Sequence, residues 1–140
     1  MKLKYKIYAE KRLLVEIISG TFNFIELKNL FNKLSADKQF MEFDKVLTNV
    51  KHAKFKISIF EVDEYIKFVK EMTKEREVTW SIITSKPKAT ALSMLITIDP
   101  FFRKKTKVFS TLEGCVDFLK IEFGEENFSE NDYTIIDFEK

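Results

Sequence analysis

Apolar and polar residues follow two different patterns along the chain. Every second residue is apolar in segments that we expect to be strands, at residues 3–8, 12–19, 43–50, 77–84 and 106–109. Apolar residues spaced three and four positions apart predict helices at about residues 22–34, 58–72, 85–98 and 110–120. Gly20 is expected to close the second strand.

Polar residues at the start of each predicted helix support these boundaries. Ser58–Glu61 and Ser110–Glu113 both read Ser-x-x-Glu, the spacing of a capping box. Thr21 or Asn23 is suited to cap the first helix, and Pro87 suits the first turn of the third. The helices are therefore predicted from their ends as well as from their apolar faces.

The element order β-β-α-β-α-β-α-β-α predicts an α/β fold with a five-stranded, mostly parallel sheet and an antiparallel first strand. Short connections place the strands side by side in sequence order. The strands alternate instead of being apolar throughout, so we expect the helices largely on one face of the sheet. The other face would be half polar, with Leu14, Ile18 and Ile83 in need of cover.

The chain divides into a domain at residues 1–123 and an acidic extension at residues 124–140. The extension also carries large apolar residues, namely Tyr133, Ile135, Ile136 and Phe138. Disordered segments are poor in aromatic and β-branched residues. We therefore predict that the extension packs on the domain or on a dimer mate, across the sheet or as an edge strand.

Composition excludes several classes of protein. The chain has 140 residues, 45% of them hydrophobic, and a net charge of +2, so no global charge directs it to nucleic acid or acidic membranes. It lacks a signal-peptide pattern and any apolar run of about 18 residues. We expect a cytoplasmic protein with no membrane span.

No group of residues predicts catalysis. His52 is the only histidine and lies among lysines, which indicates a solvated basic loop. Cys115 is the only cysteine and lies among apolar residues, as a buried thiol would. The acidic pairs at residues 63–64 and 125–126 are adjacent in sequence, so their side chains point in different directions on a helix. We predict no enzyme, no metal and no cofactor.

Two segments carry a family resemblance. Ile83–Pro87 runs into a helix, and Val108–Glu113 is followed by the apolar pair Phe118 and Leu119. With the element order, these segments resemble the STAS superfamily, and especially its SpoIIAA-like branch of anti-sigma-factor antagonists, over residues 1–120. The resemblance implies that fold and a non-enzymatic regulatory or protein-interaction module with an unidentified protein partner. Homodimer formation is left open.

Regulatory members of that family carry an aspartate-serine pair after the third strand, with a glycine two residues beyond, and the serine is phosphorylated. Aligning Asn49 with the end of that strand places Ser58 at the serine position and Phe55 on an aromatic residue. Ile57 and Phe60 replace the aspartate and the glycine. We therefore predict that Ser58 is a helix cap and not a site of phosphorylation.

A small-ligand carrier is the alternative function. Ligands of open α/β sheets bind at the carboxyl ends of the strands, where helix N-termini offer free N–H groups. We expect an apolar or anionic ligand, or a protein partner, to bind at one edge of the sheet. This edge is formed by Thr21, Asn23, Lys51, His52, Ser58, Ser85 and Lys86, together with Ser110 and Thr111.

Nucleic-acid binding is the third reading. Basic residues surround aromatic ones at residues 51–56 and 101–107, a pattern seen in single-strand binding. The isoelectric point of about 8.5 is low for that function, so we do not expect nucleic acid as a partner.

Overall fold

The computed structural model describes residues 1–40, 42–73 and 76–137, so Phe138 lies outside the described residues. Its strands are β1 (Lys2–Tyr8), β2 (Leu13–Asn23), β3 (Lys45–Lys56), β4 (Thr79–Ile83), β5 (Thr106–Phe109) and β6 (Thr134–Asp137). Its helices are α1 (Phe24–Ser35), α2 (Ile59–Met72), α3 (Pro87–Ile98) and α4 (Leu112–Leu119). Two 3-10 turns, η1 (Ala9–Lys11) and η2 (Glu125–Ser129), complete the described elements.

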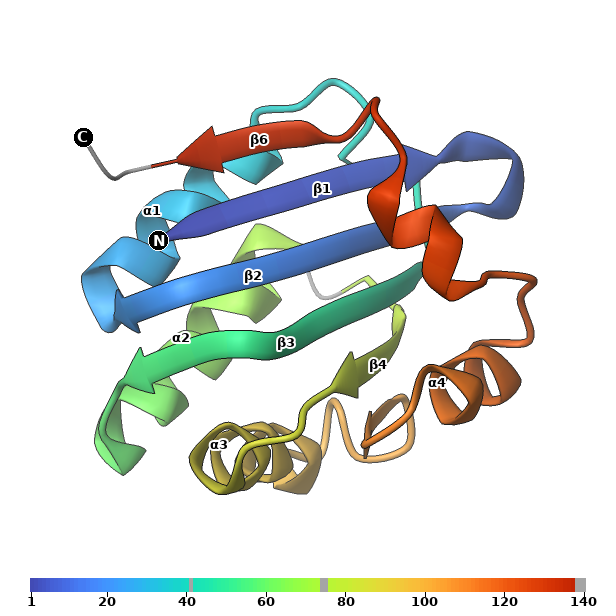
Figure 1. Cartoon of the computed structure of the whole chain (residues 1–140). Coiled ribbons are helices and arrows are strands. Elements are labelled where there is room, and N and C mark those ends of the chain that lie inside the picture. Colours follow the sequence, from blue (N-terminus) through green and yellow to red (C-terminus); the bar gives the residue numbers. More distant parts are fainter. Residues whose placement is uncertain (41, 74–75, 138–140) are drawn as a thin grey trace.

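The strands form one mixed sheet in the order β5-β4-β3-β2-β1-β6 (Figure 1). Strands β2 to β5 are parallel, and β1 is antiparallel to β2. This confirms the predicted α/β class, the mostly parallel sheet and the antiparallel first strand. The predicted number of five strands is wrong, because β6 adds a sixth strand antiparallel to β1. Strand β6 belongs to the C-terminal extension, whose placement across the sheet or as an edge strand the sequence left open, so it was not counted among the five.

The helices cover the sheet unequally. Buried side chains of α1, α2 and α3 share one core with Leu14 and Ile18 of β2, while α4 shares a second core with Leu13 and Val15. Figure 1 shows α1 and α2 behind the sheet and the segment after α4 in front of it. The prediction that the helices lie largely on one face holds for three of the four described helices. Leu14 and Ile18 face these helices and are not on the open face predicted for them.

The second core explains why α4 lies on the opposite face of the sheet from the other three helices. Strand β2 is apolar on both faces, so a single helix layer would leave one row of its side chains exposed. Cys115 and Leu119 of α4 cover this row together with Tyr133, which precedes β6. The α4 helix and the C-terminal segment thus form the second layer.

Side-chain caps fix where three helices begin. Asn23 accepts a hydrogen bond from the Glu26 N–H at 2.8 Å, and Ser58 accepts one from the Glu61 N–H at 3.2 Å. At α4 the cap is Thr111, whose Oγ1 accepts from the Gly114 N–H at 3.1 Å. Ser110, predicted as this cap, lies one residue too early.

These caps give a matched pair of stability predictions. We expect Ser58→Ala to lower the free energy of unfolding by about 1 kcal/mol, because the Glu61 N–H loses its acceptor. Ser110→Ala is the control and should change stability by less than about 0.5 kcal/mol, since Ser110 is exposed and does not cap α4. Urea unfolding of the two variants measures both values. Equal losses would contradict the assignment of the caps.

Strands β2 and β3 extend past the rest of the sheet. The last pair between β3 and β4 is Asn49 with Ile83, whereas β2 and β3 stay paired as far as Asn23 and Lys56. Gly20 lies inside this extension with a φ of +93°, so it does not close the strand as predicted. A Cβ at Gly20 would lie 2.7 Å from the Cα of Met1. Glycine therefore lets β2 pass the chain terminus and continue.

Candidate functional site

The extension of β2 and β3 has one buried and one exposed face. Phe22 and Phe55 pack toward the helices, with ring centroids 6.1 Å apart. Because side chains alternate along a strand, the residues between them point to the other face. We call this exposed surface the basic ribbon face. It consists of Thr21, Asn23, His52, Lys54 and Lys56.

A bulge places the basic residues. Between the pairs Ile17–Asn49 and Ser19–His52, β3 has one residue more than β2. The Asn49 side chain accepts a hydrogen bond from the Lys51 N–H at 3.1 Å and so holds the bulge. Lys51 and His52 therefore belong to a strand and not to the solvated loop predicted for them.

Positive charge dominates the basic ribbon face. Its five residues include two lysines and no acidic residue, and none of the ion pairs between described residues involves Lys54 or Lys56. Both lysine side chains are exposed. The surface is therefore suited to an acidic ligand.

Exposed apolar side chains lie beside this face. Ile25 is 69% exposed in the first turn of α1, and Ile59 and Phe60 are 69% and 85% exposed in the first turn of α2. Asn23 pairs with Lys56, so the two helices begin at the same end of the sheet, as Figure 1 shows. We call Ile25, Ile59 and Phe60 the apolar tip. A patch of this kind is typical of an interaction surface.

The other predicted site residues lie around the same edge. Ser58 precedes the apolar tip, but its hydroxyl and its N–H are both used in the capping box with Glu61. Ser85 and Lys86 lie one strand further along, between β4 and α3. The Lys86 carbonyl accepts from the Thr90 hydroxyl at 2.9 Å. The structure thus places the residues of the predicted edge in two neighbouring groups and not at one point.

A buried carboxyl group in the middle of the sheet was not predicted from the sequence. Glu16 of β2 is only 1% exposed, and its Oε1 accepts a hydrogen bond from Thr48 Oγ1 at 2.7 Å. Thr48 in turn accepts one from Trp80 Nε1 at 2.8 Å. The second oxygen, Glu16 Oε2, has no hydrogen-bond partner within the part of the chain that the structure describes. The available signal was a glutamate between Leu14 and Ile18, on a strand face that is otherwise apolar.

Burial changes the acid-base behaviour of this group. Loss of solvent raises the pKa of Glu16 to about 7, although the Thr48 hydrogen bond opposes the rise. Tyr65 of α2 is also buried, which raises its pKa well above 10, and the charge of Glu16 adds to the effect. Both protonation states of Glu16 are therefore accessible near neutral pH.

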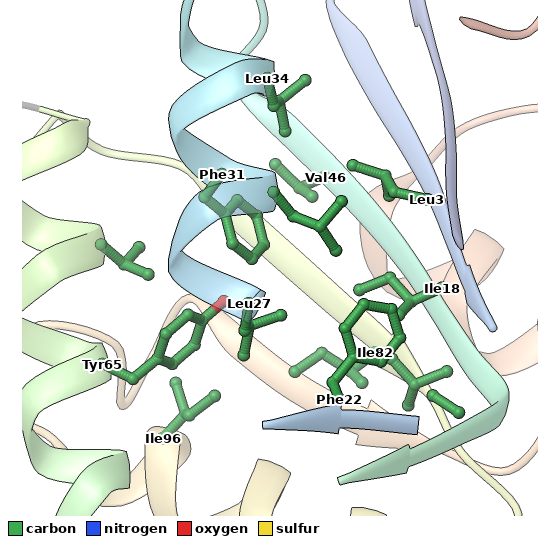
Figure 2. Packing of buried hydrophobic residues seen from close by; sticks show 14 of the residues in the cluster. Leu3, Ile18, Phe22, Leu27, Phe31, Leu34, Val46, Tyr65, Ile82 and Ile96 are labelled. Carbon is green, nitrogen blue, oxygen red and sulfur yellow. The ribbon is translucent and has the colours of Figure 1, made fainter. Parts of the chain in front are cut away.

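Two cavities adjoin this group on the helix-covered face of the sheet. One of about 60 Å³ includes Thr48 in its lining, and one of about 50 Å³ includes Glu16. Phe31, Tyr65 and Trp80 line both cavities. Figure 2 shows Phe31 and Tyr65 reaching toward each other from α1 and α2, and their ring centroids are 5.8 Å apart. Two small apolar spaces thus adjoin one buried polar group.

Cys115 gives no reactive thiol. It is fully buried in α4, and this burial raises its pKa to about 11. The thiol therefore stays protonated at neutral pH and fills space in the second core. Among residues 1–40, 42–73 and 76–137, no three His, Cys, Asp or Glu side chains are grouped as a metal site would require. The helices in these ranges are all too short or too polar to cross a bilayer.

Comparison with known proteins relates the chain to others by structure. No protein-family model matches the sequence, and no curated protein matches it. A solved structure, described as the Bacillus cell fate determinant SpoIIAA in the phosphorylated form, superposes with a TM-score of 0.52. The match covers 82% of this chain and 96% of that one at 11% sequence identity. The chain therefore has the SpoIIAA-like fold of STAS domains, as the sequence resemblance predicts.

Proposed function

We propose that the chain is a non-enzymatic regulatory module that binds a protein partner through the apolar tip and the basic ribbon face. The apolar tip is the observation that carries this proposal. Half of the large apolar residues that are exposed in the described chain, namely three of six, lie in the first turns of α1 and α2. The SpoIIAA-like fold supports a role of this class.

The two surfaces define the chemistry of the partner. Phe60 and Ile59 offer apolar area that a partner would bury, and aromatic anchors of this kind often contribute most of the binding energy. Lys54 and Lys56 would meet acidic side chains at the rim of the contact, where charge mainly speeds association. The expected partner therefore presents an apolar pocket bordered by Asp or Glu residues.

The small-ligand alternative at the strand ends stays a prediction. Two of its expected residues, Asn23 and Ser58, already use a side-chain oxygen as the acceptor of a helix cap. Ser58 Oγ already accepts the hydrogen bond from the Glu61 N–H, so we retain the proposal that Ser58 is a cap and not a site of phosphorylation. Intact-mass measurement of the protein from its native host tests this, and stoichiometric phosphate on Ser58 would contradict it.

Partner binding is tested by replacing one residue of the apolar tip. We expect Phe60→Asp to reduce capture of the partner from native-host lysate at least tenfold, because a charge replaces an apolar anchor. Ile98→Asp is the matched control, since Ile98 is 64% exposed but lies at the far end of α3. Quantitative mass spectrometry compares the captured proteins. If wild type and both variants capture the same proteins equally, the apolar tip is not the binding surface.

A further inference from the structure

The exposed side of α3 is apolar along the whole helix, which Figure 1 shows at the lower edge of the molecule. Residues 89–98 include no charged residue. The exposed apolar positions are spaced by four, three and four residues and so form one stripe on the outer surface, namely Pro87, Ala91, Met94 and Ile98. Met94 is 49% exposed and Ile98 64%. The outer side of a surface helix is ordinarily polar, so this stripe calls for an apolar environment outside the molecule.

The threonines beside this stripe need no hydrogen bond from outside the helix. Thr97 donates its hydroxyl proton to the Met94 carbonyl at 2.6 Å, and Thr90 donates to the Lys86 carbonyl at 2.9 Å. A hydroxyl group bonded to its own helix can leave water at a lower cost than a free one, as in membrane helices. Both hydroxyl groups are therefore compatible with an apolar environment.

Positive charge lies at both ends of the stripe. Lys86 and Lys88 lie at the start of α3, and Arg103 and Lys104 lie in the turns between α3 and β5. None of the ion pairs between described residues involves any of these four cations. Cations at a helix N-terminus disfavour the helix, so Lys86 and Lys88 do not stabilise α3 itself. These charges are suited to an anionic surface.

We propose that α3 is a docking surface for a membrane with negatively charged lipid headgroups. The helix would lie in the plane of the membrane surface, with Met94 and Ile98 among the acyl chains and the cations against the headgroups. Twelve residues give α3 a length of about 18 Å, so it would rest on a hydrocarbon core of about 30 Å without spanning it. The inference concerns α3 and does not depend on partner binding at the apolar tip.

Charge disfavours a second copy of the chain on this surface. An antiparallel pair of α3 helices would bring Lys88 of one copy toward Arg103 and Lys104 of the other, and a parallel pair would bring each cation toward its counterpart. Like charges repel in both arrangements, whereas an anionic membrane attracts all of them. Asp99 at the end of α3 does not offset this repulsion, because its carboxylate already pairs with Lys70 at 3.1 Å.

Binding of the full-length protein to lipid vesicles tests the proposal. The probes are phosphatidylcholine vesicles with and without about 30% phosphatidylserine, sedimented with the protein at increasing lipid concentration. We expect saturable binding to the anionic vesicles and at least tenfold weaker binding to the neutral ones. Raising the salt concentration from about 0.1 M to about 0.5 M should weaken the anionic binding by screening the cations. If the protein does not bind anionic vesicles at millimolar lipid, the proposal is wrong.

Two double variants separate the apolar contribution from the charge. Met94→Gln with Ile98→Gln keeps the charge and should weaken binding to anionic vesicles at least fivefold. Arg103→Gln with Lys104→Gln should weaken it about tenfold, because two cations near the headgroups are lost. Phe60→Gln is the control, since Phe60 is 85% exposed on the apolar tip, and it should bind within about twofold of wild type. If the first variant fails to fold, Ile98→Gln alone carries the same prediction.

Two results would overturn the proposal. If both double variants bind anionic vesicles as tightly as wild type, α3 is not the contact. Sedimentation velocity without lipid tests the other occupant. A dimer in wild type that becomes a monomer in the Met94→Gln, Ile98→Gln variant would show that a second copy covers α3.

Discussion

Wild-type protein should lose about 3 kcal/mol of stability relative to Glu16→Gln when the pH rises from 4 to 8. The cause is the buried carboxyl, whose pKa rises from 4.5 to about 7 in the folded state. A group whose pKa is raised by folding stabilises the fold fully below the unfolded value, and this contribution is lost as the pH passes through the folded value. A difference of about 2.5 pKa units corresponds to about 3 kcal/mol.

The glutamine variant isolates this effect because its side chain does not titrate. The other ionisable side chains around the cavity are Tyr65 and Arg76. Burial keeps the pKa of Tyr65 well above 10, and a guanidinium group remains charged throughout this range, so neither should titrate between pH 4 and 8. Urea unfolding of both proteins at several pH values gives the difference. Parallel stability curves would show that water reaches the carboxyl in the folded state.

A second variant tests the direction of the shift. Thr48 donates to Glu16 and lowers its pKa against the larger effect of burial. In Thr48→Val the carboxylate loses this donor, so the pKa of Glu16 should rise further, and the stability lost as the pH rises from 4 to 9 should be larger than in wild type. A smaller loss would contradict the assigned cause.

The order of elements could be predicted from the sequence because local signals mark it clearly. Asn23 and Ser58 cap helices at the expected places, and Pro87 begins the third. The predicted cap of α4, Ser110, is wrong by one residue. Ser110 and Thr111 are adjacent and both residue types cap helices, so the sequence does not distinguish them. Such signals depend on a few neighbouring residues, which is why they can be recognised without the fold.

The extent of β2 and β3 depends on contacts between distant residues. Gly20 resembles a strand end, yet it continues β2 because Met1 packs too closely for any side chain. The exposed position of His52 on a strand follows from that pairing and from the bulge beside it. Lys54 and Lys56 are evident in the sequence as basic residues. That they share one face of the sheet follows only from the pairing of β2 with β3. The basic residues of the candidate site were therefore visible in the sequence, whereas their common face and the apolar tip were not.

Glu16 shows a different limit of the sequence. A glutamate in a strand ordinarily faces water, and only the helix layer of the folded protein buries this one. Its partner Thr48, and Trp80, which donates to Thr48, come from the next two strands of the sheet. Nothing in the local sequence of β2 indicates either contact.

The C-terminal segment is joined to the domain by several kinds of contact. Strand β6 pairs with β1 from Thr134 to Asp137, and Tyr133 is 7% exposed in the second core. Glu130 accepts hydrogen bonds from Tyr8 at 2.5 Å and from Lys6 at 2.9 Å. These contacts hold the pKa of Glu130 at about 2, below its ordinary value. We therefore propose that residues 124–140 are an integral part of the fold and not an appendage.

A chain ending at Gly124 should be less stable than the full chain by about 3 kcal/mol or more. It would uncover the second core by losing Tyr133 and would leave β1 as the edge of the sheet. Burying one large apolar side chain is worth about 1.5–3 kcal/mol, and the segment contributes more than one before its ordering cost is counted. The matched control is Ile135→Ser, which changes a side chain that is 56% exposed in the same segment and should alter stability by less than about 0.5 kcal/mol. Thermal and urea unfolding of the three proteins measure the differences. If the shortened chain unfolds at the same temperature as the full chain, residues 125–140 do not stabilise the domain and its second core is complete without them.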